Sequence, residues 1–229
     1  MNNSELEALT LELNDPSQLA AYEKPFGAYQ TSLIPRILGK FLVLCGNVMY
    51  GYKPSYLKFR AIEVIARVPY QSWEAAAYTL LTLFYSNEEK AMQLSKITQF
   101  ARMAQDNETM HVVVISQLAK REGKRGFLRY TLIPFIFSFL YFVAVYLLYI
   151  IKPRYALELN YLFEQHAFEQ YGDFLKLHED ELRKKPVGSE YLLWYGRNVL
   201  NQYEFFQSVR NDELIHRNRS IREIELNEK

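Results

Sequence analysis

Two Glu-x-x-His pairs are the residues of this chain whose types and spacing fit metal chemistry. Glu108 and His111 form one pair, and Glu213 and His216 form the other. Side chains three residues apart project from the same face of an α-helix, one turn from each other. A carboxylate and an imidazole at this spacing can therefore bind the same metal ion. One pair is weak evidence, because both residue types are common on helix surfaces, but two pairs within apolar helical patterns are more specific.

Two further glutamates complete a candidate set of ligands. Glu63 and Glu164 each lie on the apolar side of a predicted helix. Two Glu-x-x-His pairs, with one more Glu from each of two other helices, are the ligands of a two-metal four-helix bundle. Four carboxylates and two histidines suit iron or manganese, whereas zinc more often takes a tetrahedral set rich in His and Cys. On the pattern alone, buried polar residues satisfied by ion pairs remain the alternative.

Other polar residues near these positions are candidates for supporting roles. The second ring nitrogen of a metal-binding His usually donates to a carboxylate or carbonyl, and Asn107 and Asp212 each precede a ligand Glu. Solvent-facing positions are the alternative for both. Tyr171 follows Glu164 by seven residues on the same face, although an ordinary core tyrosine explains it as well. Trp194 precedes Asp212 by eighteen residues, so a contact between them requires a bend in the predicted helix.

The apolar periodicity predicts an all-α fold, with helices that place the candidate ligands in a four-helix, ferritin-like bundle. The expected helices cover about residues 30–49, 55–84 with an interruption at Pro69, 89–121, 130–151, 154–183 and 189–221. Residues 1–23 are expected to form an N-terminal arm that is partly mobile. Residues 24–221 are expected to form a single helical domain, and residues 222–229 a C-terminal tail.

The apolar run at 130–151 bears on membrane association. Its 22 residues carry no charge and extend over about 33 Å as a helix, enough to cross a bilayer. A single crossing would place the helices before and after it on opposite sides, although both carry candidate ligands. Basic residues flank the run at both ends, so no orientation is favoured. We therefore predict a helix that lies in one leaflet. The basic amphipathic helix at 30–49 is expected beside it, an ordinary core-facing helix being the alternative.

Charge and cysteine content exclude several classes of protein. With 27 basic and 26 acidic residues, the chain has no broad positive field, so no nucleic-acid partner is expected. The one cysteine, Cys45, excludes an internal disulfide and a Cys-based zinc or iron–sulfur site. It is expected to be a small buried apolar residue. The polar start of the chain lacks the features of a signal peptide, so we expect a chain kept on the cytoplasmic side.

Four blocks of sequence resemble the alternative oxidases, the membrane-bound di-iron quinol oxidases. The similarity is greatest to the plastid terminal oxidase and cyanobacterial branch and covers about residues 30–217. The blocks are Glu-Val-Ile-Ala-Arg-Val-Pro-Tyr at 63–70, Asn-Glu-Thr-Met-His at 107–111, Phe-Glu-Gln-His-Ala-Phe-Glu-Gln-Tyr at 163–171 and Arg-Asn-Asp-Glu-Leu-Ile-His at 210–216.

This resemblance implies a bundle with two additional helices embedded in one leaflet. It also implies quinol oxidation coupled to the four-electron reduction of O2 to water, without proton pumping. The implied partners are plastoquinol or ubiquinol, O2, membrane lipid and a second copy of the chain. Two non-haem iron ions per chain would be bound by Glu63, Glu108, His111, Glu164, Glu213 and His216. Tyr171 would be catalytic, with Asn107, Asp212 and Trp194 next to the ligands.

The resemblance also implies a quinol pocket between the helices at 30–49, 55–84 and 154–183. Its residues would be Arg36, Lys58, Ile62, His166, Ala167 and Gln170. Three of them depart from mitochondrial members, which carry Arg, Glu and Thr at the positions of Lys58, His166 and Gln170. These departures leave the preferred quinol open. The expected location is a bacterial cytoplasmic or thylakoid membrane, with an organellar membrane as the alternative, and no thiol switch is expected at Cys45.

Two other functions compete with a quinol oxidase. A membrane-associated di-iron hydroxylase of quinone biosynthesis also has two Glu-x-x-His pairs, but it would lack the Ala-Arg-Val-Pro-Tyr and Arg-x-Asp-Glu blocks. A non-enzymatic helical bundle at the membrane surface would store or carry iron, or bind no metal, and would not consume oxygen with a quinol.

Overall fold

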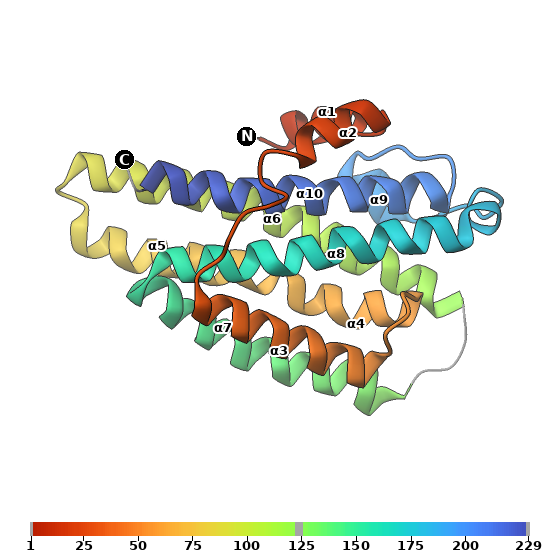
Figure 1. Ribbon diagram of the computed structural model, residues 1–229, viewed down its shortest axis with the longest axis horizontal. Coiled ribbons are helices and arrows are strands. Elements are labelled where there is room, and N and C mark those ends of the chain that lie inside the picture. Colours follow the sequence, from red (N-terminus) through yellow and green to blue (C-terminus); the bar gives the residue numbers. More distant parts are fainter. Residues whose placement is uncertain (1, 122–125, 228–229) are drawn as a thin grey trace.

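A computed structural model describes residues 2–121 and 126–227 of the chain. Within these ranges every regular element is a helix, as the sequence predicts. The elements are α1 (Asn3–Glu12), α2 (Pro16–Glu23), α3 (Leu33–Tyr50), α4 (Tyr56–Ala66), α5 (Val68–Phe84), α6 (Glu88–Arg121), η1 (Leu128–Leu132), α7 (Ile133–Ile151), α8 (Pro153–Leu182), α9 (Glu190–Tyr195) and α10 (Gln202–Asn227). The chain folds into a bundle of long helices with α1 and α2 on one side and α3 and α7 on the opposite side (Figure 1).

The bundle is built from α4 with α5, α6, α8 and α10. The long helices α8 and α10 pack against each other, and α6 packs against α4 and α5. Along α6, apolar positions at helical spacing are buried, including Ile97, Ala104 and Ile115. The same stripe contains Glu108 and His111, which are buried with it. Burial of the apolar stripe therefore also carries the candidate ligands into the interior.

The interruption predicted at Pro69 is present between α4 and α5. Helix α4 ends at Ala66, Arg67 separates the two, and α5 begins at Val68 with Pro69 in its first turn. Proline has no backbone N–H and is tolerated in the first turn of a helix, where that group has no helical partner. Glu63, three residues before the end of α4, is buried in the bundle.

The single helix predicted for residues 189–221 is wrong. Helix α9 ends at Tyr195, and Gly196 follows with a φ of 97°, a left-handed conformation that glycine adopts without strain. Helix α10 then begins at Gln202 and continues to Asn227, into the residues expected to form a tail. The apolar pattern continues across the gap, so periodicity alone did not reveal this turn.

The residues expected to form an arm are helices α1 and α2, and they are packed on the bundle. Leu6 of α1 and Leu13, which follows α1, are buried in the main apolar core, and α1 contacts α10. Capping supports both helices: the Asn2 side chain accepts from the Glu5 N–H, and the Asp15 side chain accepts from the N–H groups of the first turn of α2. The segment thus packs against α10 of the bundle.

Helices α3 and α7 present apolar side chains outward. The segments Leu33–Tyr50 and Leu128–Ile151 are each long and apolar enough to cross a membrane. Both lie lengthwise along one side of the bundle (Figure 1). The exposed residues include Leu33, Ile34, Ile37, Phe41, Leu44, Val48, Phe135, Ile136, Phe139, Leu140, Leu147 and Ile151.

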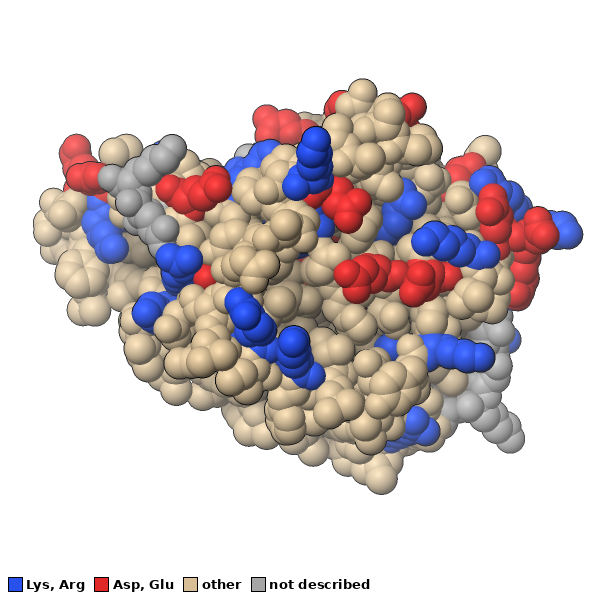
Figure 2. Space-filling model, viewed as in Figure 1, with Lys and Arg blue, Asp and Glu red and all other residues tan. Residues whose placement is uncertain are grey.

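Charged side chains are sparse over this apolar side. In Figure 2 the acidic side chains lie mainly over the upper part of the molecule, away from α3 and α7. The charged residues of α3 are the basic Arg36 and Lys40, and α7 has none. Cys45, expected to be buried, is only half-buried on α3. The face therefore combines an apolar surface with positive charge.

Candidate metal centre

The six candidate ligands meet in the interior of the bundle. They are Glu63 from α4, Glu108 and His111 from α6, Glu164 from α8, and Glu213 and His216 from α10. Each is at most 2% exposed. The convergence that the sequence spacing predicted is thus present, and it comes from four helices that bury their apolar faces against one another.

The ligand atoms form two overlapping groups. Within each group the ligand atoms lie within 4.8 Å of one another. The first group is Glu63, Glu108, His111 and Glu213, and the second is Glu108, Glu164, Glu213 and His216. Glu108 and Glu213 belong to both groups, one from each Glu-x-x-His helix. The arrangement therefore offers two neighbouring positions for cations with two carboxylates shared between them.

Many polar atoms of this cluster have no hydrogen-bond partner among the described residues. They are Oε2 of Glu63, both carboxylate oxygens of Glu108 and Glu213, Nδ1 of His111, and both ring nitrogens of His216. His216 Nδ1 lies 2.9 Å from Glu108 Oε1, but without the geometry of a hydrogen bond. Buried polar atoms are normally paired. A concentration of unpaired oxygen and nitrogen donors fits a pair of divalent cations.

The electrostatics of the cluster favour a positive charge between the carboxylates. Burial raises the pKa of Glu63 to about 7 and that of Glu213 well above its usual value. Burial also acts to raise the pKa of Glu108, but His111 and His216 outweigh it and lower that pKa. Without metal, protons therefore compensate part of the charge. Cations that displaced these protons would take over this role.

His111 is held in place by the predicted neighbours Asp212 and Asn107. Nε2 of His111 lies 2.9 Å from Oδ2 of Asp212, and Nδ1 lies 3.5 Å from both Glu108 and Glu213. Asn107 Nδ2 donates to the same Asp212 oxygen over 3.1 Å. A carboxylate only accepts, so Nε2 carries the proton and Nδ1 is free to bind a cation.

The prediction that Trp194 lies beside the ligands is wrong, and Arg197 lies there instead. Trp194 is 77% exposed, because the chain turns at Gly196 after α9. Arg197 is buried and donates to Asp212 from Nη1 over 2.6 Å and from Nη2 over 3.2 Å. Arg197 outweighs burial and lowers the pKa of Asp212. Nothing in the sequence pattern identified Arg197, since it follows a turn that the pattern also missed.

Two buried tyrosines contact opposite ends of the cluster. Tyr171 donates its hydroxyl to Glu63 Oε1, in agreement with its predicted place near the ligands. Tyr70, which sequence reasoning did not select, donates to Glu164 Oε1 over 2.7 Å. Asn160 also donates to that oxygen, over 3.0 Å. The stacking of Tyr171 on Phe59, with ring centroids 4.1 Å apart, fixes the orientation of its ring.

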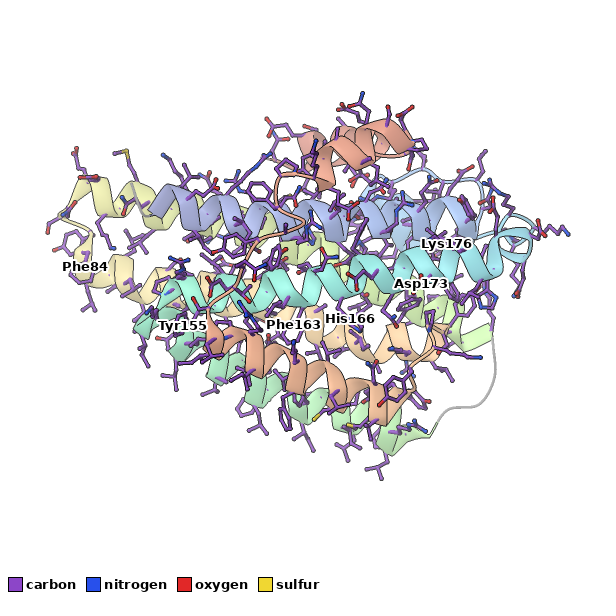
Figure 3. All side chains as sticks on the ribbon, viewed as in Figure 1. Phe84, Tyr155, Phe163, His166, Asp173 and Lys176 are labelled. Carbon is purple, nitrogen blue, oxygen red and sulfur yellow. The ribbon has the colours of Figure 1, made fainter. Side chains whose placement is uncertain are left out.

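A cavity of about 150 Å³ adjoins the cluster. Glu63, Glu164 and Tyr171 line it together with residues of α3, so it connects the candidate ligands with an apolar helix of the surface. Five of the six predicted quinol-pocket residues line it: Lys58, Ile62, His166, Ala167 and Gln170. Phe163 and His166 lie on the side of α8 that borders α3 (Figure 3). Arg36 is not part of the cavity wall and instead donates to the Thr31 carbonyl oxygen.

Lys58 is a buried cation at the wall of this cavity. Its Nζ donates to Gln170 Oε1 over 2.7 Å, to Asn47 Oδ1 over 2.8 Å and to the Tyr52 carbonyl over 3.3 Å, all of them neutral acceptors. Burial lowers the pKa of Lys58. Burial and the nearby Lys58 also lower the pKa of His166, whose Nε2 has no hydrogen-bond partner among the described residues. The cavity thus presents polar groups beside an otherwise largely apolar wall.

Comparison with known proteins gives two matches. The family described as alternative oxidase matches residues 34–222. The protein named ubiquinol oxidase 4, chloroplastic/chromoplastic, from Arabidopsis thaliana, is 29% identical over 156 residues, 68% of this chain and 42% of that protein. The chain thus aligns with less than half the length of that relative. No solved structure matches. The family match includes all six candidate ligands and leaves α1 and α2 outside it.

Proposed function

Because the chain belongs to the alternative oxidase family, we propose that it oxidises a quinol and reduces O2 to water at two non-haem iron ions. The observation that carries this proposal is the set of buried, unpaired carboxylate and imidazole atoms beside a cavity that reaches α3. The name of the similar plant protein, a ubiquinol oxidase, supports the same activity. Two quinols would be oxidised for each O2, giving two quinones and two waters.

The six buried residues would hold the two ions, and Glu108 and Glu213 belong to both groups of candidate ligands. When bound, the ions would carry electrons from the quinol to O2. The four carboxylates balance the charge of two divalent cations. Asp212 keeps His111 in the tautomer that leaves Nδ1 for a cation, and Tyr70 and Tyr171 each fix the position of one carboxylate oxygen.

The cavity would bind the quinol headgroup. The Lys58 ammonium group would give up one of its three present hydrogen bonds to donate to a ring oxygen, and the unpaired Nε2 of His166 would accept a hydroxyl proton. Quinol oxidation releases two protons with its two electrons, so the pocket needs such an acceptor. Tyr171 belongs both to the cavity wall and, through Glu63, to the metal cluster. It would therefore link the quinol to the site of oxygen reduction and act as a catalytic residue.

The apolar side formed by α3 and α7 would lie in one membrane leaflet, with the bundle outside it. A quinol dissolves in lipid, and residues of α3 line the cavity, so the donor would reach the site from the bilayer. We propose plastoquinol or ubiquinol as the donor, a bacterial cytoplasmic or thylakoid membrane as the location, and a homodimer as the assembly.

Oxygen uptake by the purified, iron-loaded chain in detergent tests this proposal. Short-chain ubiquinol and plastoquinol would serve as donors, with cyanide present and Glu213→Ala as the control. We expect cyanide-insensitive uptake that the substitution abolishes. Two bound irons without uptake would contradict quinol oxidation, and a hydroxylated quinone product would identify the hydroxylase alternative. A chain that binds no iron would contradict the metal centre itself.

A further inference from the structure

The N-terminal helix α1 reaches the support of the candidate metal centre. Thr10 is buried, and its hydroxyl donates to Oδ1 of Asp212 over 2.6 Å. Asp212 is the residue that accepts from His111. Two hydrogen bonds therefore connect a side chain of α1 with Nε2 of His111, whose Nδ1 faces the cluster. This helix lies outside the range that matches the family, so the family comparison assigns it no role.

A second residue of α1 acts on the same carboxylate through Arg197. The guanidinium group of Arg197 lies between Asp212 and Glu7, with Nε to Glu7 Oε2 at 2.9 Å and Nη2 to Glu7 Oε1 at 2.5 Å. Both Glu7 and Asp212 thus hold the buried Arg197. Pairing on both sides compensates the cost of burying its charge and leaves it little freedom to turn.

The position of α1 is itself fixed by the residue that precedes Asp212. Asn211 Nδ2 donates to the backbone carbonyl of Thr10 over 2.9 Å and to Asn14 Oδ1 over 3.0 Å. Asn211 of α10 therefore holds the backbone of α1, and the neighbouring Asp212 accepts the hydrogen bond from the Thr10 hydroxyl. Together with the buried Leu6, these contacts set the distance between Thr10 and Asp212.

We propose that α1 is a positioning element of the metal centre, in which Thr10 and Glu7 orient Asp212 and Arg197 so that His111 presents Nδ1 to a metal ion. This inference rests on the proposed function, because it presumes that the cluster binds metal. Without the Thr10 hydroxyl, Oδ1 of Asp212 loses one of its donors, and the carboxylate is less strictly oriented towards His111. Residues that support a metal ligand in this way usually affect metal affinity by about 10–100-fold.

Metal titration of the full chain tests this role without any measurement of activity. Thr10→Val removes the hydroxyl at similar volume, and Thr10→Ser keeps it. Fe²⁺ binding would be measured without oxygen by competition with a chelator, and Co²⁺ binding by visible absorption. We expect the affinity for one of two bound ions to fall about tenfold in Thr10→Val, because His111 belongs to only one of the two groups. Thr10→Ser should stay within about twofold of the unsubstituted chain.

A matched variant separates positioning from a general loss of stability. Leu182 is buried at the end of α8, in a cluster of apolar residues that includes Phe174 and Leu192. Leu182→Ala should lower the melting temperature of the metal-free chain without weakening metal binding. Equal losses of affinity in Leu182→Ala and Thr10→Val would overturn the proposal. Unchanged binding of both ions in Thr10→Val would overturn it as well, while leaving the metal centre intact. An unsubstituted chain that bound no metal would overturn both.

A second pair of variants tests Glu7. Glu7→Gln keeps the shape of the side chain and removes the charge that faces Arg197. Glu12→Gln makes the same change at an exposed position of the same helix. We expect a severalfold loss of affinity for one ion in Glu7→Gln and none in Glu12→Gln. Identical binding in the two variants would contradict the contribution of Glu7.

Discussion

The interior of the bundle and the surface of α3 and α7 both depart from the usual distribution of side chains, in opposite directions. Inside, four carboxylates and two imidazoles are at most 2% exposed. Outside, large apolar residues such as Phe139 and Ile151 are 67% and 79% exposed. Buried polar atoms normally have partners, and large apolar patches are rarely left in water. Each region would be completed by a partner that the chain does not itself supply, and under the proposed function these partners are metal ions inside and lipid outside.

The two regions should differ in how strictly they depend on geometry. A metal site requires particular atoms at particular distances, so one substitution can abolish it. A lipid-facing surface depends on summed apolar area, so single substitutions should have graded effects. Single changes in the interior should thus affect activity far more than single changes on the surface. The following predictions are ordered by their expected effect on activity.

Glu213→Gln should have the largest effect and should separate activity from stability. The variant loses a ligand that both groups share, so quinol oxidation should fall by more than about 10³-fold. In the metal-free chain, the melting temperature should hold or rise, since Glu213 is a buried acid repelled by Glu108 and Glu164. Oxygen uptake and calorimetry measure the two quantities. A large loss of metal-free stability would show that the carboxylate serves the fold itself.

Tyr171→Phe and Tyr70→Phe should differ, although each variant removes one hydrogen bond to a candidate ligand. Tyr171 lines the cavity and Tyr70 is not part of its wall. We expect uptake to fall about 10²-fold in Tyr171→Phe, the scale of a lost proton-transfer group, and several-fold at most in Tyr70→Phe. Iron content, measured alongside, should stay near that of the unsubstituted chain. Equal losses of activity would show that both tyrosines only position carboxylates.

The metal-free chain should become less stable as the pH rises from about 5 to above 7. The pKa of Glu63 is about 7 in the folded state and 4.5 in its ordinary form. Between these values the folded state binds more protons than the unfolded state, so the free energy of unfolding falls as the pH rises. Glu108 and Asp212 raise the pKa of His111, although burial acts to lower it. The raised pKa of His111 therefore favours the folded state at low pH, as that of Glu63 does. Melting temperatures of the metal-free chain across this range test the prediction, with Glu63→Gln expected to flatten the fall. Bound Fe²⁺ should reverse the trend, because it competes with these protons.

Phe139→Ser should have the smallest effect on activity. Burial of a Phe side chain contributes roughly 1.5–3 kcal/mol, so vesicle binding should weaken about tenfold or more, while uptake in detergent should be unchanged. Flotation with lipid vesicles measures the binding. Leu193→Ser is the matched control, since Leu193 is 71% exposed on α9, away from this face. Equal weakening by both variants would contradict a membrane surface confined to α3 and α7.

The convergence of the six candidate ligands could be predicted because helix periodicity is a local property. The spacing of Glu108 and His111 places them on one face, and the apolar residues around them determine that this face is buried. The break at Pro69 was equally readable, because a proline removes a backbone donor. These features depend on the chemistry of residues close together in the sequence.

The support around His111 could not be predicted in the same way. Thr10 and Asp212 come together only through packing of α1 on α10, and no short-range pattern encodes that contact. Trp194 was misplaced and Arg197 missed because the turn at Gly196 lies within an apolar pattern that continues across it. Arg36 lies on the expected helix, but its side chain bonds to Thr31 rather than facing the cavity.

The order of the helices along the chain also orders events during synthesis. Glu213 belongs to both groups of candidate ligands, so neither group is complete before α10 emerges from the ribosome. Thr10 is made 202 residues before its partner Asp212. Contacts of such sequence separation form late, because a long stretch of chain must be ordered to close them. Under the proposed function, iron would therefore bind only after α10 is made, and chains truncated before α10 would not sequester it.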